Sequence, residues 1–416
     1  KYVTSCPFCF NTGDMLEQNG HEVTYFTLKW KQNRPSKFEK YFPESKDTRK
    51  GVFRQVINLR NYFYYPDAAR KIEQLIIDEK PDIAHIHLLW GQISPSIFTI
   101  LKKYNIPTAA YENFDDPEKA LEYLRTEARF PIVLKADGLA LGKGVLICKD
   151  LKEAEDGVKE IMEDKKFGNA GNTMVIEEFM TGREVSVLTY VDGKTIRIMS
   201  SAQDHKRAKD GDQGLNTGGM GNFSPSPFYT KEVDEFCKKY IYQPTVDAMA
   251  AEGRPFTGVI FFGLMLTGEG PKVLEYNARF GDPEAQVVLP RMKNDIIDVM
   301  EACVDGKLDT IDLQFEDNAA VCVVLASDGY PVSYEKGFPI SGLEKFEGKD
   351  DYFCFHAGTA FDKEGRIVTN GGRVLGITAT GKDLKEARKK AYEATEWVDF
   401  ANKYMRHDIG KAIDEA

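Results

Sequence analysis

The sequence predicts a mixed fold: an α/β first region, a strand-rich α+β middle region and a small β-rich last region. Three observations lead to this fold class. Strand-like and helix-like segments alternate at the start, and apolar runs between glycine-rich turns fill the middle. An Asn-Gly dipeptide and a helical pattern lie near the end. With 416 residues, the chain is long enough for several domains.

The first region covers residues 1–107 and carries the α/β alternation. We place its end at Pro107, because the residue before a proline avoids the helical conformation and the preceding helical pattern must stop there. The predicted elements are, in order, a strand over residues 22–28, a helix over 68–79, a buried strand over 82–87 and a helix over 95–104.

The middle and last regions are predicted mainly from strands. The last region begins near Ala319, and its Asn370-Gly371 dipeptide favours a tight hairpin because both residue types tolerate positive φ. Middle-region strands are predicted over 132–135, 145–148, 174–179, 184–191, 256–266 and 271–277. In the last region we predict hairpin strands over 366–369 and 373–378, and a final helix over 382–397.

Composition excludes several classes of protein. The chain is 42% hydrophobic and 29% charged, which is typical of a soluble globular protein and not of a disordered or fibrous one. Its formal charge of -10 argues against broad attraction to nucleic acid or anionic lipid. The longest apolar run, residues 259–266, is too short to cross a membrane, and no leader peptide is visible. We therefore expect a cytoplasmic protein, and a monomer.

The cysteines favour a reducing compartment. Their number, seven, is odd, and they are scattered along the chain. Only Cys6 and Cys9 are close together. Their spacing is compatible with a redox or metal-binding motif and equally with two ordinary thiols in a loop, which is the simpler interpretation because no second pair follows.

Residues 135–144, Lys-Ala-Asp-Gly-Leu-Ala-Leu-Gly-Lys-Gly, are the strongest local signal. Glycines 138, 142 and 144 expose backbone N–H groups beside Lys135 and Lys143, as a loop that holds phosphates requires. The spacing is not that of a Walker loop, and a strand follows instead of a helix. We interpret the segment as a phosphate-binding flap between two strands. The alternative is a flexible hairpin with solvated lysines.

Two further segments carry oxygen-rich side chains at strand ends. Glu177 and Glu178 end an apolar strand, where they could bind a purine nucleoside or simply form its hydrated margin. Strand alternation places Glu275, Asn277 and Arg279 on one face. A carboxylate and an amide oxygen suit magnesium, and the guanidinium could bind a carboxylate in bidentate fashion. The alternative for this face is an ordinary exposed strand surface.

A long polar stretch lies between these strands. Residues 201–207 and 216–221 show neither helical nor strand periodicity, and the second segment is glycine-rich. Long loops inside compact domains are often functional, so we interpret this stretch as a substrate loop. His205 could act there as a base or could be structural.

These motifs occur together in one order, and the chain resembles the glycinamide ribonucleotide synthetase family, the phosphoribosylamine–glycine ligases of the ATP-grasp superfamily. The resemblance runs from about Thr108 to the C-terminus, roughly three-quarters of the chain. The motifs that carry it are the 135–144 flap, Gln-Asp-His-Lys-Arg at 203–207, Asn-Thr-Gly-Gly-Met-Gly at 216–221, Arg-Phe-Gly-Asp-Pro-Glu at 279–284, and the 356–358 and 369–373 segments.

The resemblance implies ligation of glycine to 5-phosphoribosylamine, with ATP cleaved to ADP and phosphate through a glycyl phosphate, in purine biosynthesis. It implies ATP and Mg²⁺ or Mn²⁺, small-molecule partners only, and catalytic roles for Arg279, Lys143 and Asp204. The implied nucleotide-binding residues are Lys135, Gly138, Gly142, Lys143, Gly144, Glu177, Glu178, Phe179 and Glu184; the metal ligands are Glu275 and Asn277; the substrate residues are Asp204, His205, Lys206, Asn216, Thr217, Gly218, Gly219, Arg279, Gly281, Asp282 and Arg373.

Residues 1–107 do not fit that family, which normally opens with a glycine-rich domain. They resemble the N-terminal, Rossmann-type part of a GT-B family 4 glycosyltransferase, on segments 20–26, 80–87 and 91–96. The chain is thus expected to be a chimera, and two alternatives to an active ligase follow: an inactive ATP-Mg-binding protein, or a glycosyltransferase remnant fused to the ligase. The expected units are 1–107, a small ATP-grasp lobe over 108–191, a large lobe over 192–318 and a C-terminal domain over 319–416.

Overall fold

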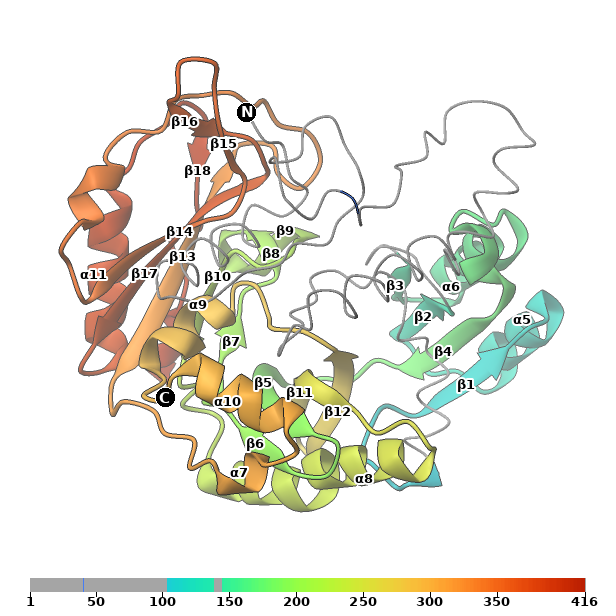
Figure 1. Ribbon diagram of the computed structural model, residues 1–416. Coiled ribbons are helices and arrows are strands. Elements are labelled where there is room, and N and C mark those ends of the chain that lie inside the picture. Colours follow the sequence, from blue (N-terminus) through green and yellow to red (C-terminus); the bar gives the residue numbers. More distant parts are fainter. Residues whose placement is uncertain (1–39, 41–102, 138–143, 416) are drawn as a thin grey trace.

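The computed structural model describes residue 40, residues 103–137 and residues 144–415, and the statements that follow concern these residues (Figure 1). Among their helices, none combines the length and the apolar character that crossing a membrane requires. The elements expected over 22–28, 68–79 and 82–87, most of the helix expected over 95–104, and Gly138, Gly142 and Lys143 lie outside the described residues.

A small four-stranded antiparallel sheet forms the first lobe, at the right of Figure 1. Leu134 is fully buried against helices on one face, where it packs with Leu124 and Ile176. The side chain of Asp116 caps the first helix by accepting a hydrogen bond from the Glu118 N–H. The elements are β1 (Tyr111–Phe114), β4 (Met174–Glu178), β2 (Ile132–Ala136) and β3 (Val145–Cys148) in sheet order, with α5 (Pro117–Thr126), α6 (Leu151–Val158), η2 (Lys159–Glu163) and η3 (Gly168–Asn172).

The second sheet, in the lower centre of Figure 1, has apolar side chains on both faces. Along β5, Val185 and Val187 face one cluster, and Leu188 and Tyr190 face the other, as strand alternation dictates. The sheet is therefore covered on both sides. Its elements are β12 (Gly270–Asn277), β11 (Thr257–Thr267), β5 (Arg183–Asp192) and β6 (Ile196–Ile198) in order, with α7 (Lys231–Cys237), η5 (Lys238–Tyr242), α8 (Gln243–Ala251), α10 (Ile296–Val304) and η7 (Leu308–Thr310).

The third sheet combines strands from the middle and last regions of the sequence, at the left of Figure 1. All nine residues of its strand β13 are buried. Helix α11 packs against β13 and β17, and the short helix α9 packs against β10 and β13. The elements are β14 (Tyr352–His356), β17 (Arg373–Gly381), β13 (Ala319–Ser327), β10 (Gly221–Ser224) and β7 (Gln203–Asp204) in order, β18 (Lys403–Tyr404) beside β13, α9 (Ala285–Val288), η6 (Leu289–Arg291), η8 (Leu343–Phe346), α11 (Leu384–Thr395) and η9 (Lys411–Glu415).

Two small hairpins complete the described structure. One joins β15 (Thr359–Phe361) and β16 (Ile367–Thr369). The other joins β8 (Arg207–Lys209) and β9 (Gln213–Asn216) through η4 (Asp210–Asp212), and it is called the 207–216 hairpin below.

Most predicted strands are confirmed, as is the final helix, but three expectations were wrong. Asn370-Gly371 does not close a hairpin, because β16 pairs with β15 while β17 joins the third sheet. The polar stretch over 201–221 is not one loop but holds β7, β8, β9 and the start of β10. Strand β5 pairs with β11, so it belongs to the second sheet and not to the lobe expected over 108–191.

The fully buried strand β13 leads to a stability prediction. Leu325→Ala should lower the free energy of unfolding by about 2–5 kcal/mol, because truncating a buried leucine loses apolar burial and leaves a cavity. The same change at Leu215, which is 57% exposed, should have little effect. Urea unfolding monitored by circular dichroism compares the two variants. Equal destabilisation by both would contradict the packing described for β13.

Candidate active site

Lys135 lies on β2, and its ammonium pairs with a buried carboxylate of β4. The Lys135 Nζ to Glu177 Oε2 distance is 2.6 Å, and the Glu177 side chain is 3% exposed. Burial raises the pKa of Glu177, and the Lys135 ammonium only partly offsets this effect. The second oxygen, Oε1, is buried without a hydrogen-bond partner. The pair therefore offers an ammonium held in place and an acceptor oxygen available to a ligand's hydroxyl or amino group.

The flap predicted between β2 and β3 begins and ends as expected. The two strands pair antiparallel, with Lys135 opposite Val145, and the Ala136 N–H donates to the carbonyl of Gly144 over 2.9 Å. Glu178 faces away from Glu177, as its neighbour in a strand must. Its carboxylate accepts from the Ala110 N–H over 3.0 Å and pairs with Lys272 over 3.3 Å, so it ties the first lobe to the second.

Lys206 lies between two carboxylates of the second sheet. Its Nζ is 2.7 Å from Glu184 Oε2 on β5 and 3.6 Å from Glu275 Oε1 on β12. Although burial acts to lower it, the pKa of Lys206 is raised, because Glu275 and Glu184 stabilise the ammonium. Two strands thus place carboxylates where they hold a positive charge.

The predicted metal ligands fit magnesium in chemistry. Glu275 is half-exposed and faces a cation in this structure, and the Asn277 amide oxygen lies two residues further along β12. These are hard oxygen donors, and Mg²⁺ keeps water or phosphate oxygens in its remaining positions. Among the described residues, no group of three or more His, Cys, Asp and Glu side chains forms a metal-binding cluster.

Arg279 follows β12 and remains near its predicted partners. Its Nη1 donates to the carbonyl of Phe280 over 2.7 Å, and its Nη2 donates to Asn277 Oδ1 over 3.4 Å. The guanidinium is exposed. It lies beside the Asn277 amide, although β12 ends at Asn277, so strand alternation does not extend to Arg279.

Two acidic side chains are enclosed beside Lys206. Burial of the Asp204 carboxyl, together with the nearby charge of Glu284, raises the pKa of Asp204 well above its ordinary value. The positive charges of Lys206 and Arg373 oppose this rise. Burial also raises the pKa of Glu284, whose Oε1 accepts from the Ser186 hydroxyl over 3.1 Å. Both carboxyls therefore favour the protonated form more than an exposed carboxyl does.

The glycine-rich 216–221 segment is fixed by the C-terminal domain. Arg373 Nη1 on β17 donates to the carbonyls of Gly218 and Asp282, over 2.7 and 2.8 Å, and its Nη2 is 3.2 Å from Asp282 Oδ2. Gly219 has a φ of +112°, and a Cβ there would lie 2.7 Å from an Asp204 carboxylate oxygen. Close approach to Asp204 therefore requires glycine at this position.

His205 is not placed to act as a base, which corrects that alternative. Its Nδ1 lies 3.2 Å from the carbonyl of Gly221, and its Nε2 accepts from the Gly410 N–H over 3.2 Å. Both ring nitrogens are therefore engaged in one neutral tautomer. Burial, reinforced by the charge of Arg406, lowers the pKa of His205 to about 4. The imidazole is a structural bridge.

Comparison with known proteins decides the family. Residues 97–285 match the phosphoribosylglycinamide synthetase ATP-grasp (A) domain, and residues 320–412 match the C domain of the same synthetase. A phosphoribosylamine–glycine ligase of Caldanaerobacter subterraneus is 46% identical over 310 residues, which are 74% of this chain and 73% of that protein. The chain belongs to the phosphoribosylamine–glycine ligase family.

Other members of the ligase family agree in sequence and in structure. The chloroplastic phosphoribosylamine–glycine ligase of Arabidopsis thaliana is 49% identical over 311 residues, and this chain spans 58% of its length. The crystal structure of the Thermotoga maritima enzyme is similar with a TM-score of 0.68 and 36% identity, over 76% of this chain and 78% of that one. Residues 8–138 also match Glycosyltransferase Family 4, in line with the resemblance of the first region.

The ligase fold brings most predicted site residues together. Glu184, Lys206 and Glu275 form one charged group, which lies beside Asp204, and Asp282 and Arg373 hold the glycine-rich segment to it. Thr217 belongs to the same region, since its N–H and hydroxyl both donate to the carbonyl of Lys206. Lys135 and Glu177 stand apart from these residues, on the first sheet.

Two functional residues were missed from the sequence. Glu284 lies within the 279–284 motif, and its position before a helix could have marked it as inward-facing. Tyr330, whose hydroxyl accepts from the Gly218 N–H over 3.1 Å, is far away in sequence and carries no motif. Only the fold reveals that contact.

The Lys135–Glu177 pair leads to a pH-dependent prediction. In Lys135→Met the buried carboxylate loses its cation, so stability at pH 8 should fall by on the order of 3 kcal/mol. Because the pKa of Glu177 is raised in the folded protein, the contribution of this carboxyl to stability is largest below its ordinary pKa of 4.5 and is lost as pH rises toward the folded pKa. Removing Lys135 raises the folded pKa further and extends this loss to higher pH. Adding Glu177→Gln should restore stability. Urea unfolding at pH 4 and pH 8 measures the stability of the single and the double variant. If Lys135→Met lost the same stability at both pH values, the pairing would be refuted.

The buried His205 predicts a loss of stability in acid. The pKa of His205 is 6.5 in the unfolded chain and about 4 in the folded protein. Its contribution to stability is therefore lost as pH decreases from 6.5 to 4. The loss should reach on the order of 3 kcal/mol, since one pKa unit corresponds to about 1.4 kcal/mol. His205→Gln should lack this component. Denaturant titrations at pH 7 and pH 4.5 test it, and identical acid sensitivity of variant and wild type would count against the assignment.

Proposed function

We propose that this chain joins glycine to 5-phosphoribosylamine and cleaves ATP to ADP and phosphate, forming glycinamide ribonucleotide in purine biosynthesis. The observation that carries the proposal is the convergence of Glu184, Lys206 and Glu275, because these side chains come from separate motifs within the stretch that matches the ligase family. The reaction needs charge neutralisation and alignment of three substrates, and this arrangement supplies charged groups of both signs.

The proposed reaction has two steps. A carboxylate oxygen of glycine attacks the γ-phosphorus of ATP, and ADP leaves. The amine nitrogen of phosphoribosylamine then attacks the acyl carbon, phosphate leaves, and the amine loses a proton. Each step moves negative charge between oxygens, so positioned cations lower the barrier without covalent catalysis by the protein.

Roles follow from the positions of the side chains. Lys135 and the flap with Lys143 and Gly144 bind the ATP phosphates, and the end of β4 receives the adenosine. Glu275 and Asn277 would hold magnesium, which when bound neutralises phosphate charge. Arg279 binds the carboxylate of glycine. Asp204 and Lys206, with the 216–221 segment, line the acyl-phosphate side.

Further parts of the proposal concern the whole chain. We place the protein in the cytoplasm as a monomer, and the described cysteines, all of them free thiols, support a reducing compartment. We divide the chain into 1–107, the two ATP-grasp lobes and a C-terminal domain from 319. The match of residues 8–138 to another family supports a chimera. The same match favours a second candidate, a protein that binds ATP-Mg without ligation.

ADP release tests the function directly. We expect release only when ATP-Mg, glycine and phosphoribosylamine generated in place are all present. Glu275→Gln should reduce the rate by on the order of 100-fold and raise the magnesium requirement, because it removes a charge that positions the phosphates. The matched control is Glu269→Gln. Glu269 is 81% exposed and directly precedes β12, the strand that carries Glu275, so this variant should release ADP at the wild-type rate.

The outcomes separate the candidates. ADP release that requires all three substrates establishes the ligase. Calorimetric binding of ATP-Mg without release identifies the inactive chimera. ADP release by Glu275→Gln at the wild-type rate and magnesium requirement would overturn the metal assignment.

A further inference from the structure

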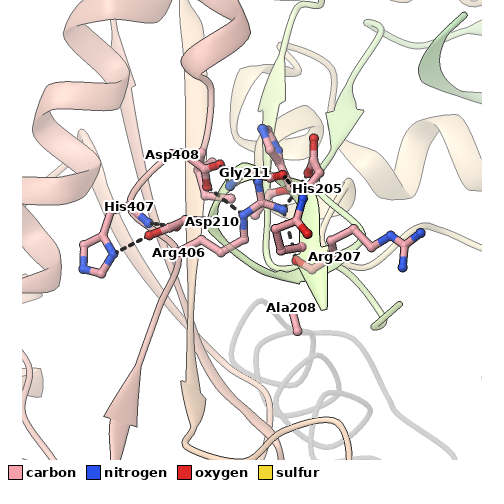
Figure 2. A network of polar contacts seen from close by, with 12 residues as sticks. His205, Arg207, Ala208, Asp210, Gly211, Arg406, His407 and Asp408 are labelled. Carbon is pink, nitrogen blue, oxygen red and sulfur yellow. Dashed lines mark hydrogen bonds and ion pairs between the residues drawn. The ribbon is translucent and has the colours of Figure 1, made fainter. Parts of the chain in front are cut away.

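The C-terminal segment 404–410 lies along the 207–216 hairpin, and Arg406 is the centre of this contact (Figure 2). The Arg406 side chain is 1% exposed. Its Nε and Nη2 donate to both oxygens of Asp408, over 2.7 and 2.8 Å, in a bidentate pair. Its Nη1 reaches the hairpin, donating to the carbonyl of Arg207 over 3.0 Å and to Asp212 Oδ1 over 2.9 Å.

Further hydrogen bonds extend this contact along both segments. Asp408 Oδ2 accepts from the Gly211 N–H over 2.8 Å, and the Tyr404 hydroxyl donates to the carbonyl of Ala208 over 2.8 Å. His407 donates its N–H to Asp210 Oδ1 over 2.7 Å. Figure 2 shows Arg406 directed toward Asp408, and His407 directed toward Asp210, whereas the Arg207 side chain points away from Arg406. The hairpin is thus held from its first strand to its turn.

Among the described residues, few other contacts fix the position of the hairpin. All four residues of its strand β9 are exposed, and within the described part of the chain β8 and β9 pair only with each other. A two-stranded hairpin is marginally stable on its own. Its placement therefore depends on the 404–410 segment.

The base of the hairpin leads directly into the charged group of the site. Arg207 is paired with Asn216, and the preceding Lys206 accepts two hydrogen bonds from Thr217 through its carbonyl. The Lys206 ammonium then lies between Glu184 and Glu275. A shift of the hairpin would move Lys206 relative to both carboxylates.

We propose that Arg406 is a positioning residue: by fixing the 207–216 hairpin to the C-terminal segment, it holds Lys206 at the acyl-phosphate side of the site. The inference rests on the proposed function for the role of Lys206. A buried guanidinium is costly to desolvate and is poor evidence for stability alone, which favours a geometric role. Its planar fork donates four hydrogen bonds to acceptors in two segments, one more than the three that an ammonium can donate.

The test compares Arg406→Met and Arg406→Lys with a matched control, Arg388→Met. Arg388 also forms a bidentate pair with a carboxylate, that of Asp414, and donates to the carbonyl of Gly410, but it does not contact the hairpin. It therefore reports loss of C-terminal anchoring alone. Three quantities are measured: hydrogen exchange of hairpin amides including Gly211, KM and kcat for glycine, and affinity for ADP in EDTA.

Arg406→Met should increase exchange of the hairpin amides and raise KM for glycine roughly 10- to 100-fold, the effect of a small misplacement in a site. Affinity for ADP should stay within about twofold, because Lys135 and β4 lie on the other sheet. Arg406→Lys should recover part of the loss. Arg388→Met should change neither the exchange of the hairpin nor KM for glycine.

If Arg406→Met does not fold, Asp212→Asn replaces it, since Asp212 is 74% exposed and its change weakens only a hairpin-side contact, by removing the negative charge that Arg406 faces. Asp212→Asn should change hydrogen exchange of the hairpin amides and KM for glycine in the same direction as Arg406→Met, but by a smaller amount. The inference would be overturned if a folded Arg406→Met or Asp212→Asn showed wild-type hydrogen exchange and a wild-type KM for glycine. It would also be overturned if Arg388→Met changed both quantities as much as Arg406→Met does. If the wild type shows no ligation, the proposed function fails, while hydrogen exchange still tests whether Arg406 fixes the hairpin.

Discussion

The pairing of β10 with β13 is the contact on which the site depends. It joins Gly221–Ser224, the end of the glycine-rich segment, to the buried central strand of the C-terminal domain. A Cβ at Gly221 would lie 2.7 Å from the carbonyl of Cys322, so the strands approach this closely only with glycine there. Because β13 also pairs with β17, the same register brings Arg373 within reach of Gly218. The C-terminal domain is therefore part of the site.

At two places, charges that the fold removes from water are met by opposite charges. Lys135 meets Glu177 on the first sheet, and Arg406 meets Asp408 at the C-terminal segment. Without such partners, the cost of burying each ion would favour its neutral form or a different packing. The same rule explains why Lys206 lies between two carboxylates. Under the proposed function, Lys135, Lys206 and Glu275 would also receive a polyanionic nucleotide and its cation.

Among the described residues, the long strands of the middle and last regions and the final helix were predicted, because their apolar residues repeat with the strand or helix period; helices α5, α6, α8 and α10 were not predicted. Strand β3 was predicted with its observed bounds, Val145–Cys148. The hairpin at Asn370-Gly371 failed because turn chemistry shows that a chain can reverse, not which strands pair afterwards. The role of Arg406 could not be predicted, since its partner Asp212 is 194 residues away and only tertiary structure joins them. Glycine motifs and paired carboxylates were visible; contacts between domains were not.

The two family matches overlap over residues 97–138, and the structure decides how the described part of this overlap is folded. Strands β1 and β2 both pair with β4, so residues from Tyr111 onward complete the first ATP-grasp sheet. Earlier still, Thr108 donates its hydroxyl to the carbonyl of Val273, and Ile106 is buried in the core beneath the second sheet. These contacts pack the described residues from about 106 onward against the strands of the ligase sheets. In the proposed division of the chain, the join between the two families lies close to this point.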